Sequence, residues 1–360
     1  MANIEFLGKA PDGTPVSSYE LSCDGVTARV MDFGATLLSL SAPSRDGAAE
    51  DIILGFDRLD GYFDNPACYG ATVGPSANRT DLGQVTIGEA TYQMPKNDGP
   101  DSRNNLHTDL AGGLHKRVWN VEPAKDDSSV TFSITLADGD YGLPGNRWIT
   151  ATYALAPSPE GGVALTLHYR CESDAPTFAN MTNHTYWNLA GHASGLVLNQ
   201  LVSVNASHYL PLRSDNVSLG EVADVADTPF DFRQAKELGR DIELEDEQLA
   251  QGRGYDHCLC VDGYDGTSMP RHALHAEDSE SGRVLDISIT TPGAHLYTGN
   301  WLAGGCPETK TGGRYNDYDG VAIECQNYPD AVNHPDFPSP LLRPGETYCQ
   351  KIVFRFGTFA

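Results

Sequence analysis

Two short segments rich in polar and aromatic residues hold the groups best suited to chemistry. Residues 181–189 read MTNHTYWNL and offer the imidazole of His184, and residues 323–330 read IECQNYPD and offer the carboxylate of Glu324. An imidazole can act as a general acid near neutral pH and a carboxylate as a general base. The amides and rings around them are groups that bind sugar hydroxyls and sugar C–H faces. The pair therefore suggests acid–base chemistry on a carbohydrate.

The first segment allows two interpretations. An extended strand would place His184, Tyr186 and Asn188 on one face, where they could line a sugar pocket. Alternatively, His184 packs in the core beside Trp187, as isolated histidines in apolar surroundings often do. The residue types alone leave these interpretations about equal.

The second segment has the same ambiguity. Glu324 follows the apolar run Val321-Ala322-Ile323 and precedes a polar stretch, so it stands near the end of an expected strand. Because an unpaired glutamate is costly to bury, the side chain is either outward and solvated or buried for a function. Three further groups, Arg79, His107 and Asp256, lie in polar loops, where solvated side chains and structural ion pairs are common.

The elements that must position these groups are strands. Apolar and polar residues alternate strictly at Val130, Phe132, Ile134 and Leu136, and the same period recurs at 163–169, 285–289 and 352–356. Asp-Gly pairs that suit tight hairpins stand at 12–13, 24–25, 46–47, 138–139 and 262–263. Only residues 231–251 combine helix formers with helical spacing, and Gly239 interrupts them. We therefore expect one large antiparallel β domain over residues 1–360, with few short helices.

Composition narrows the classes of partner. The chain has 24 basic and 49 acidic residues, a net charge of −25, which disfavours nucleic acids, anionic membranes and phosphorylated sugars. It contains neither a P-loop nor a G-x-G-x-x-G motif. Its eight cysteines are dispersed without a Cys-x-x-Cys pair, which indicates neither a disulfide scaffold nor a zinc site. With no apolar run of about 18 residues and no signal region, we expect a cytoplasmic protein that binds a neutral small molecule.

Taken together, the motifs resemble those of the galactose mutarotases, also called aldose 1-epimerases, over nearly the whole chain. The resemblance is carried by Asn78-Arg79, 105–107 (NLH), 182–192 (TNHTYWNLAGH), 228–233 (TPFDFR), 254–257 (GYDH), 297–300 (YTGN), and the stretches 329–331 and 344–348. It implies a large β-sandwich of antiparallel strands and no metal or organic cofactor. It also implies interconversion of the α and β anomers of free hexoses such as galactose and glucose.

The resemblance also implies roles for individual residues. His184 matches the general acid and Glu324 the general base, while Arg79, His107 and Asp256 match groups that hold or polarise the sugar. Asn78 and Tyr186 are expected in the same pocket. Two departures bear on pocket shape and sugar preference: Pro75 stands where an arginine is frequent, and Thr108-Asp109 replace a common glycine pair.

Three alternatives remain at this stage. A glycoside hydrolase would use two carboxylates astride the bond, for which Asp256 and Glu324 are the candidates. A non-catalytic sugar-binding or regulatory module could use the same fold. A hexose 6-phosphate epimerase would need a basic phosphate cradle, which this acidic chain does not evidently provide. Neither the preferred aldose nor the choice between monomer and homodimer follows from the sequence.

Overall fold

Antiparallel strands are the dominant regular secondary structure of the computed structural model, which describes residues 3–122, 128–306 and 308–359. The nine-stranded sheet has the order β11 (Asn120–Glu122), β12 (Ser129–Leu136), β13 (Arg147–Pro157), β14 (Val163–Ser173), β28 (Tyr348–Thr358), β24 (Arg283–Ile289), β23 (Arg271–Glu277), β18 (Leu201–Val204) and β21 (Lys236–Glu237). The six-stranded sheet has the order β17 (Tyr186–Trp187), β26 (Val321–Gln326), β25 (Gly293–Tyr297), β22 (Asp256–Val261), β19 (Ala206–Tyr209) and β20 (Ala223–Asp224). A five-stranded sheet runs in chain order through β1 (Asn3–Lys9), β2 (Pro15–Cys23), β3 (Val26–Met31), β4 (Thr36–Pro43) and β5 (Ala49–Asp51).

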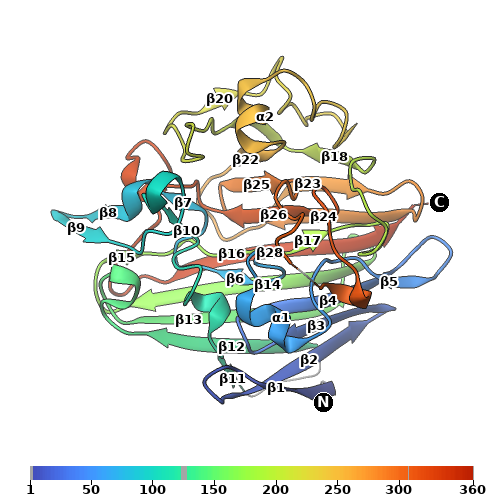
Figure 1. The fold of residues 1–360 in the computed structure, drawn as a ribbon, viewed down its shortest axis with the longest axis horizontal. Helices are drawn as coiled ribbons and strands as arrows, with labels where there is room; N and C mark the ends of the chain where they lie inside the picture. Colours follow the sequence, from blue (N-terminus) through green and yellow to red (C-terminus); the bar gives the residue numbers. More distant parts are fainter. Residues whose placement is uncertain (1–2, 123–127, 307, 360) are drawn as a thin grey trace.

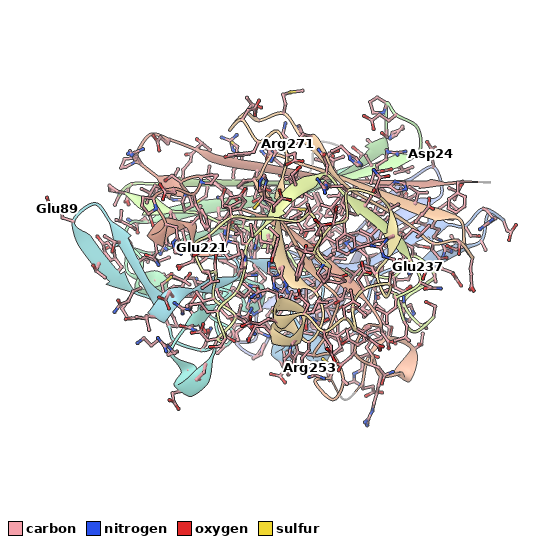
Figure 2. The ribbon with its side chains drawn as sticks, turned by 90° about the horizontal axis from the view of Figure 1, so that it is seen from above. Asp24, Glu89, Glu221, Glu237, Arg253 and Arg271 are labelled. Carbon is pink, nitrogen blue, oxygen red and sulfur yellow. The ribbon has the colours of Figure 1, made fainter. Side chains whose placement is uncertain are left out.

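Smaller elements complete the fold. Short strands pair as β6 (Thr72–Val73) with β16 (Thr182–Asn183), β7 (Arg79–Thr80) with β10 (Asn105–Leu106), β15 (Thr177–Phe178) with β27 (Leu341–Leu342), and β8 (Gln84–Ile87) with β9 (Ala90–Gln93). The helices are α1 (Leu59–Asp64) and α2 (Glu247–Gly252), and single 3-10 turns lie at Asp81–Gly83, Pro100–Ser102, Leu114–Lys116, Asp140–Gly142, Lys310–Gly312 and Ala331–Asn333. Figure 1 shows the long strands crossing the molecule with α2 at one edge, and Glu89 marks the tip of the projecting β8–β9 hairpin in Figure 2. In the part of the chain that is described, no helix is long and apolar enough to cross a membrane.

The predicted strands are confirmed. The alternating segments at 130–136, 163–169, 285–289 and 352–356 are β12, β14, β24 and β28, and β14 pairs with β28 along nine consecutive residue pairs from Val163↔Phe356 to Cys171↔Tyr348. The Asp-Gly pairs at 12–13, 24–25 and 46–47 close hairpins within the five-stranded sheet. The pair at 262–263 does not close a hairpin, because β22 and β23 on either side of it belong to different sheets. The all-β antiparallel sandwich predicted from the sequence is therefore correct.

The helical interpretation of residues 231–251 is mostly wrong. That segment contains the strand β21, several turns and, at its end, all but the last residue of α2. This helix begins at Glu247, after Asp246 accepts hydrogen bonds from the backbone of Gln248 and Leu249. Lys236 is buried in β21 and donates to Asp241 and to the backbone oxygen of Pro229. These tertiary contacts override the helix propensity of the segment.

The core lies between the nine-stranded sheet and the other two sheets. Trp187 of β17 packs against Phe354 and Phe356 of β28, with ring centroids 5.1 and 5.7 Å apart. Along β26, Ile323 and Cys325 belong to this core, so the intervening Glu324 must point to the opposite face of its sheet. Alternate side chains of β26 thus fill the core, and the side chain of Glu324 between them points away from it.

Candidate active site

A cavity of about 400 Å³, lined by both polar and apolar side chains, lies on that opposite face of the six-stranded sheet, beside β7, β10 and the loop that carries Trp301, Leu302 and Gly305. All seven side chains predicted from the sequence line it: Asn78, Arg79, His107, His184, Tyr186, Asp256 and Glu324. They come from distant parts of the chain, so only the tertiary fold brings them together. The volume lies within the range of about 300–1,000 Å³ usual for small-molecule sites.

Glu324 lines the cavity, and its side chain is buried, with only 2% of the residue exposed. Its oxygen Oε1 lies 3.7 Å from Nε2 of His184, and Oε2 is buried without a hydrogen-bond partner among the described residues. Of the two possibilities left open for this glutamate, the buried one is correct. A buried carboxylate oxygen without a partner is costly, which marks it as a group available to a ligand.

His184 is held between two short strands. Its backbone N–H donates to Ala71 and its carbonyl accepts from Gly70, which ties residue 184 to the segment next to β6. The ring contacts His107 and Tyr186 at centroid distances of 5.2 and 5.1 Å. Asn188 is not in the cavity, contrary to the strand interpretation, because its amide donates to the backbone oxygens of Gly195 and Asp319 instead.

The protonation of His107 follows from one backbone contact. Its ring nitrogen Nδ1 accepts a hydrogen bond of 3.1 Å from the backbone N–H of Asn78. The backbone N–H of His107 in turn donates to the carbonyl of Asn78 at 3.1 Å. Burial, followed by the nearby His184 and Arg79, lowers the pKa of His107 well below its ordinary value. Because a neutral imidazole with Nδ1 as acceptor carries its proton on Nε2, His107 is a hydrogen-bond donor at its other nitrogen.

Arg79 and Asp256 form a charged group on another side of the cavity. Arg79 donates through Nε to Asp98 at 2.9 Å, and its Nη1 lies 3.6 Å from Asp256. Burial raises the pKa of Asp256, but the hydrogen bond from His295 at 2.8 Å and the charge of Arg79 outweigh this effect and bring the pKa to about 2. Asp256 is therefore ionised, and it can accept hydrogen bonds from hydroxyls but cannot deliver a proton.

Several residues in or next to the site were not identified as site residues from the sequence, among them the lining residues Asp98, Tyr297 and Trp301 and the supporting residue His295. His295 of β25 is the cross-strand neighbour of Glu324 on β26, and its ring donates a hydrogen bond to the carboxylate of Asp256. Tyr297 alternates with His295 along β25, and this period-two spacing was the available signal for both. Trp301 stands at the cavity beside Arg253, whose guanidinium carbon lies 4.2 Å from the ring centroid. The end of α2, where Figure 2 labels Arg253, thus reaches the site.

The groups His107, His184 and Glu324 place their ligand atoms within 4.8 Å of one another, a combination known from zinc sites. The tautomer of His107 does not suit a metal. Its Nδ1 is engaged by a backbone N–H that can only donate, so Nε2 carries a proton where a metal ligand requires a lone pair. The donor set fits a polar organic ligand better.

The two departures from the family pattern lie outside the cavity. Neither Pro75 nor Thr108 is among its lining residues. Thr108 is fully buried, and its hydroxyl bridges the backbone N–H and carbonyl of Ser76, at 2.9 and 3.1 Å. Thr108 therefore connects the loop after β10 to the segment before β7 by hydrogen bonds.

Solved structures with this architecture define the class of protein. An aldose epimerase homologue from C. elegans superposes with a TM-score of 0.84 at 31% identity, covering 96% of this chain and 100% of the other. The galactose 1-epimerase of Lactobacillus acidophilus superposes with a TM-score of 0.82 at 26% identity, with 100% coverage of both chains. The fold is thus the β-sandwich of the galactose mutarotase-like proteins.

Sequence comparison identifies the family. The aldose 1-epimerase family pattern matches residues 17–355. The galactose mutarotase of Homo sapiens is 37% identical over 353 residues, which cover 98% of this chain and 97% of the human protein. The aldose 1-epimerase of Escherichia coli K12 is 35% identical over 351 residues, which cover 96% and 97% of the two chains. The chain belongs to the aldose 1-epimerase family and is an isomerase of the epimerase type.

Proposed function

We propose that the protein is a mutarotase that interconverts the α and β anomers of free hexoses such as D-galactose and D-glucose, with residues 1–360 acting as one domain. The observation that carries the proposal is the buried pair of His184 and Glu324, which meet at 3.7 Å in a cavity lined by groups that bind hydroxyls. The names of the mammalian and bacterial relatives support the same activity.

In the proposed reaction, His184 protonates the ring oxygen while Glu324 removes the proton of the C1 hydroxyl. The C1–O5 bond then breaks and a free aldehyde forms. Rotation about the C1–C2 bond presents the other face of the carbonyl, and the reverse proton transfers close the ring as the other anomer. Each such proton-transfer group typically contributes about 10²- to 10⁴-fold in rate, so the side chains of His184 and Glu324 together would accelerate ring opening substantially.

The remaining groups hold the sugar while C1 reacts. His107 offers its Nε2–H to the C1 oxygen, where negative charge develops as Glu324 removes the proton. Arg79 and the ionised Asp256 bind the other hydroxyls and keep the ring in one orientation. Tyr186 and Asn78 complete the wall next to the two histidines.

Hydrolysis of glycosides is less compatible with this geometry. A hydrolase needs one carboxyl group that holds a proton for the leaving group. Asp256, with a pKa of about 2 and hydrogen-bonded by His295, is ionised at any physiological pH. Asp98 and Asp256 are engaged by Arg79 and His295, whereas Glu324 lies next to the imidazole of His184, so the groups placed for proton transfer are one imidazole and one carboxylate.

Polarimetry of freshly dissolved α-D-galactose and α-D-glucose tests the proposal. The protein should accelerate the decay of optical rotation, and Glu324→Gln should reduce kcat by about 10²-fold or more while the folded structure and galactose binding remain. Glu277→Gln, which alters a partly exposed glutamate of β23 on the other sheet, is the matched control. Wild-type turnover in folded Glu324→Gln would refute the mechanism, and sugar binding without acceleration by the native protein would favour the non-catalytic alternative.

A further inference from the structure

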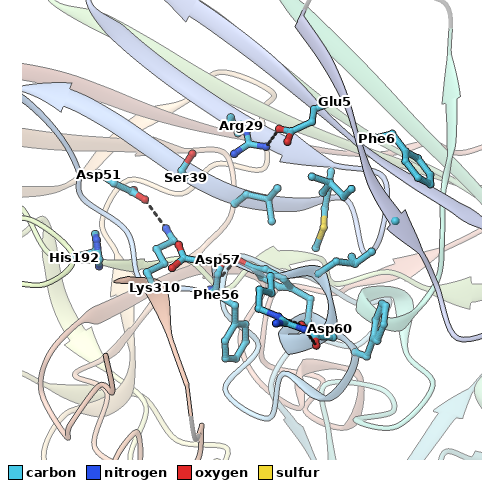
Figure 3. A pocket seen from close by; sticks show the side chains of 18 of the residues that line it. Glu5, Phe6, Arg29, Ser39, Asp51, Phe56, Asp57, Asp60, His192 and Lys310 are labelled. Carbon is cyan, nitrogen blue, oxygen red and sulfur yellow. Dashed lines mark hydrogen bonds and ion pairs between the residues drawn. The ribbon is translucent and has the colours of Figure 1, made fainter. Parts of the chain in front are cut away.

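A second cavity, of about 770 Å³, opens on the outer face of the five-stranded sheet and shares no lining residue with the catalytic cavity. Cross-strand register puts four polar residues together on that face. Ser39 of β4 is opposite Arg29 of β3, and Ser41 of β4 is opposite Asp51 of β5. Lys310 reaches over from the far end of the chain and donates to Asp51 at 2.6 Å (Figure 3).

Several polar groups in this cavity retain hydrogen-bonding capacity. The ammonium group of Lys310 has three N–H donors, and its described acceptors are Asp51 and the carbonyl of Ile53. Arg29 uses only Nη2 for its contacts with Glu5 and Ser18 among the described residues. The hydroxyls of Ser39 and Ser41 line the cavity and are partly buried, and among the described residues neither has a hydrogen-bond partner. Donors and acceptors are thus available side by side.

An apolar wall accompanies these polar groups. Met31, Leu38 and Leu59 form part of the lining, and Phe6 of the edge strand β1 lies at one end of the cavity (Figure 3). Phe6 is 63% exposed, so its ring is accessible to a ligand at that end of the cavity. An apolar wall next to the unpartnered hydroxyls of Ser39 and Ser41 and the remaining N–H groups of Arg29 and Lys310 matches the alternating C–H and O–H surface of a sugar.

The charges in the lining decide against an ionic ligand. Four cations, Lys9, Arg29, Arg58 and Lys310, face four carboxylates, Glu5, Asp51, Asp57 and Asp60. Three of the cations are already paired, as Arg29 with Glu5, Arg58 with Asp60, and Lys310 with Asp51. A phosphate or other anion would need a surplus of positive charge that the cavity does not offer and that the net charge of −25 further opposes.

We propose that this cavity is a second, non-catalytic binding site for a neutral carbohydrate. Its chemistry is that of hydroxyl recognition by Arg29, Lys310, Ser39 and Ser41, with the apolar side chains of Met31, Leu38 and Leu59 against the C–H groups of the sugar and Phe6 at the end of the cavity. The site does not depend on the proposed mechanism, because none of its residues lines the cavity of His184 and Glu324.

The test uses the full-length protein and methyl β-D-galactopyranoside, which has no free anomeric hydroxyl and is not turned over. Its affinity is followed by saturation-transfer NMR titration. Phe6→Ala should weaken binding at the second site about fivefold. This change in Kd corresponds to about 1 kcal/mol, the typical contribution of one aromatic contact. The matched control is Ile4→Ala, since Ile4 lies on the same strand, is 60% exposed and does not line the cavity.

A second pair of variants fills the cavity. Ser39→Tyr should abolish the component of binding that Phe6→Ala weakens, and Ser22→Tyr, on β2 outside the cavity, should leave it intact. Melting temperatures close to that of the native protein establish that each variant is folded. Unchanged binding in both Phe6→Ala and Ser39→Tyr overturns the proposal. Displacement of the glycoside by inorganic phosphate would overturn the assignment of a neutral ligand.

Discussion

Replacing His107 with leucine removes one N–H donor from the candidate active site and leaves the backbone N–H of Asn78 without its acceptor. Two separate losses are expected. Loss of a donor aimed at developing negative charge typically lowers kcat by about 10²- to 10³-fold, equivalent to roughly 2.7–4 kcal/mol. The orphaned N–H of Asn78 lies in a residue that is 3% exposed, so the free energy of unfolding should also fall, by about 1–3 kcal/mol.

His107→Gln separates these effects from proton transfer. A glutamine amide can donate as Nε2–H does, but it has no titratable group. Because burial lowers the pKa of His107 well below its ordinary value, this ring is neutral at neutral pH. We therefore expect His107→Gln to recover part of the activity that His107→Leu loses and to keep both limbs of the native profile of kcat/KM against pH.

Polarimetry from pH 5 to 9 measures the profiles, and urea unfolding measures the stability. If one limb of the pH profile vanished in His107→Gln, His107 would be a titrating acid or base, and the tautomer argument would be refuted. Equal activity in the leucine variant and the native protein would remove His107 from the mechanism.

Three further perturbations have defined outcomes. Asp256→Asn should lower kcat/KM for galactose by about 10- to 100-fold, measured by polarimetry, since a charged hydrogen bond to a hydroxyl is worth roughly 1.5–3 kcal/mol. Gly70→Ala should melt far below Gly25→Ala in calorimetry: both glycines have positive φ, but a Cβ at residue 70 would overlap the carbonyl oxygen of Leu37, whereas residue 25 has open space. Equal melting temperatures would contradict this. His275→Gln should be destabilising at acidic pH only. The hydrogen bond to Asp286 raises the folded pKa of His275, so its stabilisation is full below the unfolded pKa of about 6.5 and disappears as pH rises through the folded value. A melting-temperature difference that grew with pH would contradict the sign.

The success of the strand predictions has a local cause. Side chains of a half-buried strand alternate between two faces, so the pattern at Val163, Leu165 and Leu167 can be recognised without knowing any neighbour. The helical spacing noted over 231–251 produces a helix only at its end, in α2, because the earlier part forms a strand and turns held by contacts such as the buried ion pair of Lys236 with Asp241 at 2.7 Å, which helix propensity does not predict. Local periodicity therefore predicts elements well only where burial itself is periodic.

Part of the candidate active site could likewise be predicted from the sequence. Residue types identified an imidazole and a carboxylate suited to proton transfer, and motif resemblance added Arg79, His107 and Asp256. Neither source distinguished a buried from a solvated Glu324. The fold decided this, because its neighbours Ile323 and Cys325 occupy the sandwich core and turn Glu324 to the opposite face, beneath covering loops.

What the sequence determined by itself was the kind of secondary structure, the chemical groups available and the family. What only the tertiary structure decided was their mutual placement: the 3.7 Å approach of His184 to Glu324, the proton position on His107, and the support of Asp256 by His295. The physical reason is that hydrogen bonding and electrostatic coupling fall off within a few ångströms, whereas the residues involved are separated by long stretches of chain. The second cavity was invisible in the sequence for the same reason, since Lys310 meets Asp51 only after the chain has folded.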